Sequence, residues 1–401
     1  MIFRVCRFGI GCRMNNGKYV FSQVTSFLNF NDFLKCIKRY DGNYKVLHFT
    51  CWHQLLCLLF GQLSNQESLS DLMICLATQQ SKWYHLGMGT GISRSNLAYA
   101  NEHRDWRIFA DYAYMLIAKA RILCKGSTEL EVYTKGNVYA IDATTIDLCL
   151  SVFWWAKFRK TKAAVRIHTQ FDIQTNIPTF IHITDGSVHE VNFLDEIDYE
   201  PEGFYVLDRG YVDFDRLYVI QQAKAFFVTR LKQHINYRRL YSARVDKAAG
   251  VLCDQTIRLN NDKALKDYPE KLRRIKYYDA PTNMELEFMT NNFSLCAADI
   301  ALLYKYRWSI ELFFKWIKQH LKVKSFWGYS ENAVRIQIYT AIIAYVTVAI
   351  VKEDLKIKHS NYEILQILSL TLLNKTQLDQ LFEQTDLQTL KDLNSNQLNL
   401  I

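Results

Sequence analysis

The sequence predicts a mixed α/β protein in which a helical N-terminal part precedes a β-sheet with helices packed on it. Three observations support this fold class. Apolar residues recur at helical spacing up to about residue 125. From about residue 131, short runs rich in β-branched and aromatic residues take over. Residues 304–318 then form an amphipathic helix with an unusual set of charges on its polar face.

Composition favours a folded, basic protein of two or three domains. Of 401 residues, 49% are hydrophobic and 22% charged, so a large core can form, and the net charge of +9 suits a polyanionic partner. The ten cysteines include no CxxC and no zinc spacing, which is typical of buried thiols in a reducing cytoplasm. The apolar run 336–351 is short for a membrane span and predicts a core helix, with no membrane partner.

The N-terminal domain, residues 14–130, is expected to be helical. Met14 looks like a natural start, so residues 1–13 are expected to be a non-native extension. A further helix follows the glycine-rich segment 87–91, capped by Ser93 or Ser95, and could either enter a DNA groove or pack in an ordinary bundle. The other expected helices are 20–37, 49–63, 69–77 and 106–123.

The central part is predicted to form a mixed sheet. A helix at 214–223 lies between the last two of the expected strands. The catalytic core is assigned to 131–231 and 291–355, a basic β-rich insertion to 232–290, and a helical C-terminal segment to 356–401. The expected strands are 137–141, 164–171, 179–184, 204–207 and 225–229.

Two aspartates end apolar strands. Asp142 follows 138–141, and Asp208 follows 204–207 and precedes a turn. Carboxylates at the carboxyl ends of adjacent strands meet where ligands bind in open α/β sheets, and Glu311 could close the triangle. Three carboxylates repel one another, and hard divalent cations relieve that repulsion, so the set favours Mg²⁺, with Mn²⁺ as a substitute. Two such ions roughly 3.5–4 Å apart suit in-line phosphoryl displacement.

The helix 304–318 separates two faces at about 100° per residue. Leu303, Ile310 and Phe313 belong to the stripe that faces the core. A second arc carries one carboxylate among cations and a phenol, which suggests chemistry on nucleic acid. Its members are Tyr304, Arg307, Glu311, Lys315 and Lys318.

Each candidate also has a structural interpretation, which the sequence leaves open. Asp142 could cap the following turn, with Asp147 as an alternative ligand. Asp208 could be a turn or cap residue, and Glu311 could be ion-paired to Arg307 or Lys315. The remaining polar residues near the sheet are expected to be structural: Asp172, Asp185, His168, His182 and His189.

With these residues in place, the chain resembles the DDE transposases of insertion sequences. The order of the three acids is that of the DDE triad. The spacing Tyr304-x2-Arg307-x3-Glu311-x6-Lys318 fits the Y-R-E-K signature of insertion-sequence family four. The resemblance covers roughly residues 14–370, and the N-terminal part resembles the helical domain that precedes the core in one branch of that family.

The resemblance implies an RNase H-like core with a β-rich insertion. It also implies that Asp142, Asp208 and Glu311 are catalytic and bind two metal ions. Tyr304, Arg307 and Lys318 would contact phosphates of double-stranded DNA at the ends of the element, with Lys315 as a weaker addition.

The chemistry implied by the family begins with nicking of one strand by water and attack of the freed 3′-hydroxyl on the opposite strand. Hairpin opening and transfer into target DNA follow. The resemblance also implies a homodimer that bridges two ends, in the bacterial cytoplasm and associated with the nucleoid. An aromatic residue of the insertion often stacks on a flipped base. The candidates are Tyr237, Tyr241, Tyr268, Tyr277 and Tyr278, and the sequence does not rank them. Alternative functions are an inactive DNA-binding derivative, another RNase H-like nuclease, or a metal-dependent phosphatase.

Overall fold

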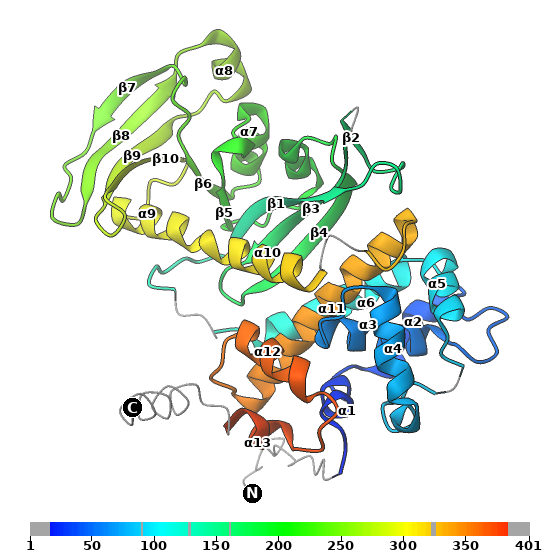
Figure 1. The fold of residues 1–401 in the computed structure, drawn as a ribbon. Coiled ribbons are helices and arrows are strands. Elements are labelled where there is room, and N and C mark those ends of the chain that lie inside the picture. The colour runs from blue at the N-terminus through cyan, green and yellow to red at the C-terminus, as the bar shows by residue number, and fades with distance from the viewer. Residues whose placement is uncertain (1–16, 90, 127–129, 160–161, 322–325, 384–401) are drawn as a thin grey trace, which may run out of the picture.

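The computed structural model describes residues 17–89, 91–126, 130–159, 162–321 and 326–383. A twisted sheet lies beside a bundle of helices and continues into a second lobe (Figure 1). The mixed α/β fold class is therefore confirmed. The expected extension at residues 1–13, and the C-terminal segment beyond residue 383, lie outside the described residues.

The N-terminal part is helical, and polar side chains fix where its helices begin. The one expected helix at 20–37 is in fact two, because Asn29 accepts hydrogen bonds from the amides of Asn31 and Asp32 and starts a new helix. Thr50 forms a capping box at the start of α3. The helices are α1 (Val20–Thr25), α2 (Phe30–Arg39), α3 (Cys51–Leu63), α4 (Leu69–Thr78), η1 (Gln80–Lys82), α5 (Arg94–His103) and α6 (Arg107–Leu123).

A long C-terminal helix, α11 (Glu331–Leu355), forms the centre of the helical layer. It packs against α3 and α6, so the N-terminal helices share one core with the end of the chain. Within the described residues it is the helix long and apolar enough to cross a membrane, yet 94% of its apolar window is buried inside the protein. The expectation of a buried core helix at 336–351 agrees with this packing.

Five strands form a sheet with RNase H-like topology. β1 is antiparallel to β3 and parallel to β5, β3 is antiparallel to β4, and β5 is parallel to β6. The helix α7 (Phe214–Gln222) connects the parallel pair β5 and β6. The strands are β1 (Val138–Leu148), β3 (Lys162–Asp172), β4 (Ile177–Asp185), β5 (Phe204–Leu207) and β6 (Phe226–Arg230), with the short β2 (Lys157–Arg159) at the edge.

The insertion continues this sheet rather than forming a separate one. β10 pairs with β6, and the order then runs β9, β8 and β7, which makes ten strands in the described part of the chain. The β-rich insertion expected before Glu311 is therefore confirmed as a feature of the fold. Its elements are β7 (Tyr237–Ser242), β8 (Val251–Leu259), α8 (Asp262–Asp267), β9 (Leu272–Asp279) and β10 (Met284–Thr290).

Helices return after the insertion. α10 lies across β1, with the buried Ile310, Phe313 and Ile317 facing the core. The expected single helix at 304–318 is interrupted at Arg307, where α9 ends and α10 begins. The amide of Arg307 bonds to the carbonyl of Tyr304 and the amide of Ile310 to that of Arg307, a locally tightened turn. The helices are α9 (Ala297–Tyr306), α10 (Trp308–Leu321), α12 (Asn361–Thr371) and α13 (Leu378–Glu383).

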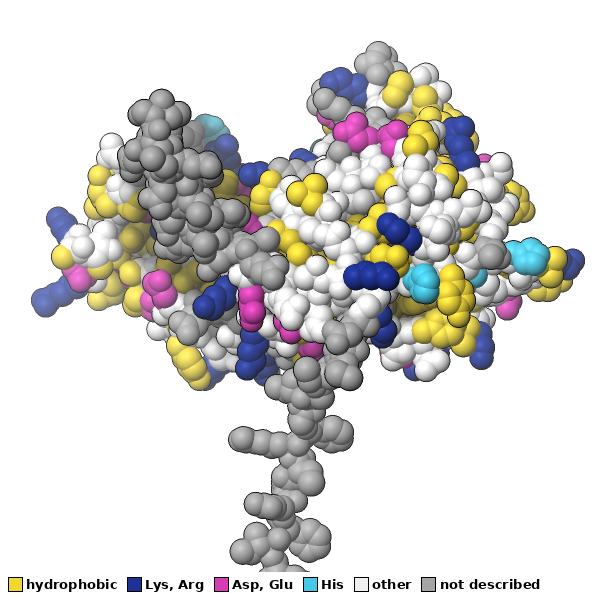
Figure 2. All heavy atoms as spheres, turned by 60° about the horizontal axis from the view of Figure 1, so that its bottom comes forward, with side chains coloured by type: hydrophobic (Ala, Val, Ile, Leu, Met, Phe, Trp, Pro, Cys, Tyr) yellow, Lys and Arg dark blue, Asp and Glu magenta, His cyan; other side chains and the backbone are white. Residues whose placement is uncertain are grey.

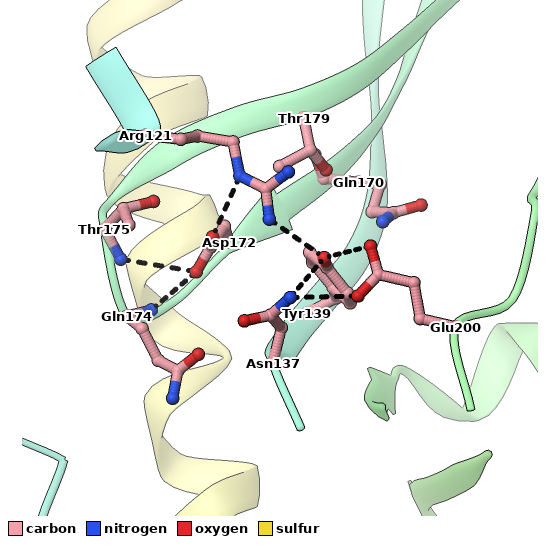
Figure 3. Close-up of polar contacts among 9 residues, drawn as sticks. All are labelled: Arg121, Asn137, Tyr139, Gln170, Asp172, Gln174, Thr175, Thr179 and Glu200. Carbon is pink, nitrogen blue, oxygen red and sulfur yellow. Dashed lines mark hydrogen bonds and ion pairs between the residues drawn. The ribbon is translucent and has the colours of Figure 1, made fainter. Parts of the chain in front are cut away.

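A polar network joins the helical layer to the sheet at the start of β1 (Figure 3). Arg121 of α6 contacts Asp172 at 3.2 Å and donates to the hydroxyl of Tyr139 at 3.0 Å. That hydroxyl donates to Glu200 at 2.8 Å, and Asn137 donates to Glu200 at 2.9 Å. Asp172 also accepts from two backbone amides of the next turn, so its carboxylate has a structural role.

Candidate active site

The sheet register brings two of the candidate acids together. The parallel pairing of β1 and β5 ends at Ile141 opposite Leu207, so Asp142 and Asp208 each follow the last paired residue of adjacent strands. The sequence suggested that Asp142 ends its strand, and this is wrong. β1 continues past Asp142 to Leu148, paired there with β3 alone. Both acids nevertheless lie at the edge of the sheet where β5 ends and a turn begins, which is where ligands bind in open α/β sheets.

Glu311, the third acid, is connected to Asp142 by the side chain of Arg307. The Arg307 guanidinium donates from Nη1 to Asp142 Oδ2 at 3.1 Å and from Nη2 to Glu311 Oε1 at 2.6 Å. The Tyr304 hydroxyl donates to Asp208 Oδ1 at 3.4 Å. Two residues of the signature therefore link all three acids, which come from β1, from the turn after β5 and from α10.

These contacts resolve some of the structural alternatives. The Asp208 carboxylate makes no capping bond to the short helix η3 (Arg209–Tyr211) that it precedes. Asp142 lies inside a strand, where its Oδ1 accepts from the Ala143 amide at 2.8 Å. The ion pair between Glu311 and Arg307 is present, as one alternative expected, but the same guanidinium also binds Asp142.

Burial makes the charge on Asp142 costly. Its side chain is 19% exposed. Burial raises the pKa of Asp142 to about 6, with smaller contributions from Asp208 and Glu190, while the Ala143 amide and Arg307 oppose the rise. The surroundings of Asp142 thus favour its neutral form more than an exposed position would.

Tyr304 and Arg307 are held by packing as well as by charge. The Tyr304 ring is buried against Phe288, with centroids 5.0 Å apart, which differs from the expected solvent-facing position. The Arg307 guanidinium lies 5.6 Å from the centroid of the Tyr304 ring. Burial alone lowers the pKa of Arg307, but Tyr304, Asp142 and Glu311 together raise it above its usual range.

A cavity of about 500 Å³ opens beside the acids. Asp142 and Glu311 form part of its wall, and the exposed Lys315 and Lys318 stand on the α10 side. Asp142, Glu311, Lys315 and Lys318 therefore line one space, and on α10 this agrees with the helical-wheel argument. The remaining lining residues are Ala143, Thr144 and Phe314.

The sequence did not single out two residues near these acids. Tyr211, in the turn after Asp208, is 1% exposed, and its hydroxyl has no hydrogen-bond partner in the described part of the chain. Burial, followed by Asp142 and Glu190, raises its pKa well above the usual range. Glu190, at the start of η2 (Glu190–Glu196), lies 3.6 Å from Arg166 of β3. In the sequence, the only signal for these two residues is that Tyr211 lies three positions after Asp208.

The other candidates have structural surroundings. His168 is buried, bonds to Thr184 at 3.0 Å and stacks on Phe193. Asp185 accepts a hydrogen bond from the Ser187 amide at 2.8 Å, as expected of a turn. Across the described ranges, no group of three or more His, Cys, Asp or Glu side chains is close enough to form a ready cage for an ion. Arg307 lies between two of the acids that could form one.

The fold and its acids define a class: an RNase H-like sheet with two carboxylates just past the last paired residues of adjacent parallel strands and a third on a helix. A family model described as a transposase DDE domain matches residues 133–347. The chain belongs to this family of transposases, and the resemblance seen in the sequence is confirmed. A second model, described as a domain of unknown function (DUF4372), matches residues 16–89.

Three curated relatives carry transposase names. The chain is 35% identical over 262 residues to transposase y4zB of Sinorhizobium fredii, covering 63% of this chain and 70% of that protein. It is 26% identical over 238 residues to a transposase named for insertion sequence element IS5377 of Geobacillus stearothermophilus, covering 59% and 62%. It is 27% identical over 266 residues to one named for element IS4SA of Synechocystis, covering 64% and 71%.

Among solved structures, the chain is similar to a piggyBac transposase in a synaptic complex with hairpin DNA. The TM-score is 0.46 at 11% identity, over 96% of this chain and 86% of that one.

Proposed function

We propose that this transposase binds the inverted-repeat ends of an insertion sequence, cleaves them at Asp142, Asp208 and Glu311, and joins the 3′-hydroxyl ends to target DNA. One observation carries the proposal. Acids from three separate elements are linked through Arg307 and Tyr304 at one edge of an RNase H-like sheet. A purely structural ion pair needs two partners, whereas this arrangement links three carboxylates, two of which, Asp142 and Glu311, line an open cavity.

The donor set fits divalent cations. The three acids offer oxygen donors alone, which hard ions such as Mg²⁺ and Mn²⁺ prefer. Burial is the main cause of the raised pKa of Asp142, so it disfavours the ionised carboxylate, which a bound cation would stabilise. When bound, a pair of such ions supplies activation of the attacking oxygen and charge stabilisation of the leaving oxygen.

The protein's own residues hold and orient the DNA. Lys315 and Lys318 are exposed on α10 beside the cavity, where they can bind phosphates that flank the scissile bond. Tyr304 positions Asp208 through its hydroxyl, and we propose that it and Arg307 also contact phosphate. Cleavage by water leaves a 3′-hydroxyl, and the same site then directs that hydroxyl against a phosphate of the target.

The insertion offers a second DNA-binding surface. Its edge strand β7 is exposed from Arg238 to Ser242, and it carries Arg238, Arg239 and the 65%-exposed Tyr241. Tyr268, in contrast, is fully buried, so it is a poor candidate for stacking on a flipped base. The face in Figure 2 shows Lys and Arg scattered among Asp, Glu and apolar side chains, without one basic patch. We propose that the cavity and β7 supply the main contacts, in a homodimer that bridges two ends.

A nicking assay tests the proposal. The substrate is a labelled duplex from the DNA that flanks the coding region, incubated with the full chain and Mg²⁺. We expect nicking by the wild type and by Asp147→Asn, which changes another carboxylate of β1, but none by Asp142→Asn or Glu311→Gln. Binding without nicking by the wild type would favour an inactive DNA-binding derivative. Nicking without transfer into a target plasmid would favour another RNase H-like nuclease.

A further inference from the structure

Arg307 uses the oxygen atoms that a metal ion would need. Asp142 Oδ1 already accepts a hydrogen bond from the Ala143 amide, so Oδ2 is the oxygen that faces other partners. That oxygen is the one bound by Arg307 Nη1. On the opposite side, Nη2 binds Glu311 Oε1 at 2.6 Å. The guanidinium therefore occupies the space between the two acids, where an ion bridging them would lie.

The two occupants exclude each other for an electrostatic reason. A guanidinium and a divalent cation repel strongly when both contact the same carboxylate, and the site is only partly open to screening by solvent. Asp142 is 19% and Arg307 16% exposed. The charge balance leads to the same conclusion. One guanidinium carries less positive charge than the three carboxylates carry negative charge when ionised, so a divalent cation in place of the guanidinium would balance them better.

Few contacts other than the two ion pairs hold the Arg307 guanidinium in place. Arg307 lies at the interruption between α9 and α10, its Nε is buried without a hydrogen-bond partner in the described residues, and its guanidinium lies near the Tyr304 ring. Rotation away from the acids thus breaks two ion pairs and no hydrogen bond of Nε. The adjacent cavity, with Lys315 and Lys318, is the space where DNA phosphate would be found.

We propose that Arg307 is a displaceable internal cation that links metal loading to DNA binding. In the metal-free protein it holds Asp142 and Glu311 together. A divalent cation bound by these oxygens would free the guanidinium to bind a phosphate of the transposon end. Metal and DNA therefore increase each other's affinity, as thermodynamic linkage requires. This inference rests on the proposed function of the three acids.

The first test is titration of the full-length protein with Ca²⁺ by calorimetry, without DNA, so that no reaction follows. Arg307→Ala removes the competitor, and we expect it to bind Ca²⁺ at least about tenfold more tightly than the wild type, within the usual range for coupled sites. Lys315→Ala removes a charge that lines the same cavity but does not bridge the acids, and should change affinity by less than about fivefold. Arg307→Lys retains the charge without spanning both acids, and should fall between Ala and wild type.

The outcomes separate this inference from the function on which it rests. Equal or weaker Ca²⁺ binding by Arg307→Ala, with a folded far-ultraviolet spectrum, overturns the displacement while leaving the metal site in place. Absence of Ca²⁺ binding by every variant, including the wild type, overturns the metal site and with it the proposed function. Loss of binding in Asp142→Asn is expected in either case and confirms where the ion binds.

The second test measures the linkage to DNA. Binding of the flanking-DNA duplex is measured with and without Ca²⁺ for the wild type, Arg307→Ala and Lys318→Ala. We expect Ca²⁺ to strengthen DNA binding by the wild type several-fold more than by Arg307→Ala, while Lys318→Ala weakens binding in both conditions and retains the gain. An equal gain in wild type and Arg307→Ala refutes the release of Arg307.

Discussion

Removing His168 should make the protein less sensitive to mild acid. His168 is 1% exposed, and burial, together with His182 and Arg166, lowers its pKa from 6.5 to about 3. Below about pH 6.5, His168 therefore binds a proton in the unfolded chain but stays neutral in the folded chain until the pH approaches 3. Stability contributed by neutral His168 is complete above that pH and is lost as the pH falls.

The magnitude follows from the two pKa values. At pH 5 the unfolded histidine is almost fully protonated and the folded one almost fully neutral, which costs about 2 kcal/mol relative to pH 7.5. The result depends little on the exact low value, because any folded pKa below about 4 gives nearly the same cost at pH 5.

The assay compares urea unfolding at pH 7.5 and pH 5 for the wild type, His168→Gln and His103→Gln. The wild type should lose about 2 kcal/mol more than His168→Gln between the two pH values. The exposed His103 of α5 is the control, and its variant should follow the wild type. Equal pH dependence in wild type and His168→Gln, or a His168 NMR titration centred near pH 6.5, would refute the reasoning and reopen a functional role for this residue.

Three further predictions concern the site and its support. Glu311→Gln should retain binding to end DNA but reduce cleavage below detection in a gel assay, and measurable cleavage would remove Glu311 from the catalytic set. Arg307→Ala, measured with Ca²⁺ present, should reduce the slope of log binding constant against log salt by about one phosphate contact; an unchanged slope would argue against that contact. Asp172→Asn should lower the unfolding free energy by about 2 kcal/mol, because Arg121 loses its charged partner while the turn amides retain an acceptor. Urea unfolding measures that loss, and Asp185→Asn is its control, because the half-buried Asp185 accepts from a turn amide and has no arginine partner among the ion pairs of the described residues.

Local pattern predicted most elements of the fold. The strand at 204–207 and the helix at 214–223 agree with β5 and α7 to within a residue. Helices expected at 49–63, 69–77 and 106–123 agree with α3, α4 and α6 to within two residues. These segments are dominated by apolar periodicity, which depends on near neighbours in the chain. The break at Asn29 escaped notice because the apolar pattern continues across it, although the cap itself is local.

Other features depended on distant partners. β1 extends to Leu148 because β3 pairs with it along its length, which no property of residues 142–148 reveals. Tyr304 is buried because Phe288 of the insertion packs on it. The raised pKa of Tyr211 likewise depends on burial and on charges, such as Asp142, that only the folded sheet brings near it.

The sequence by itself determined the kinds of element, their order, and the identity and spacing of the three acids and the signature residues. The tertiary structure alone decided that Ile141 pairs with Leu207, that this places Asp142 beside Asp208, and that one guanidinium lies between Asp142 and Glu311. The physical reason is that helical and strand periodicity arises from neighbours in the chain. Strand register and the balance of buried charge arise instead from residues far apart in the chain that meet only when the sheet and α10 pack together.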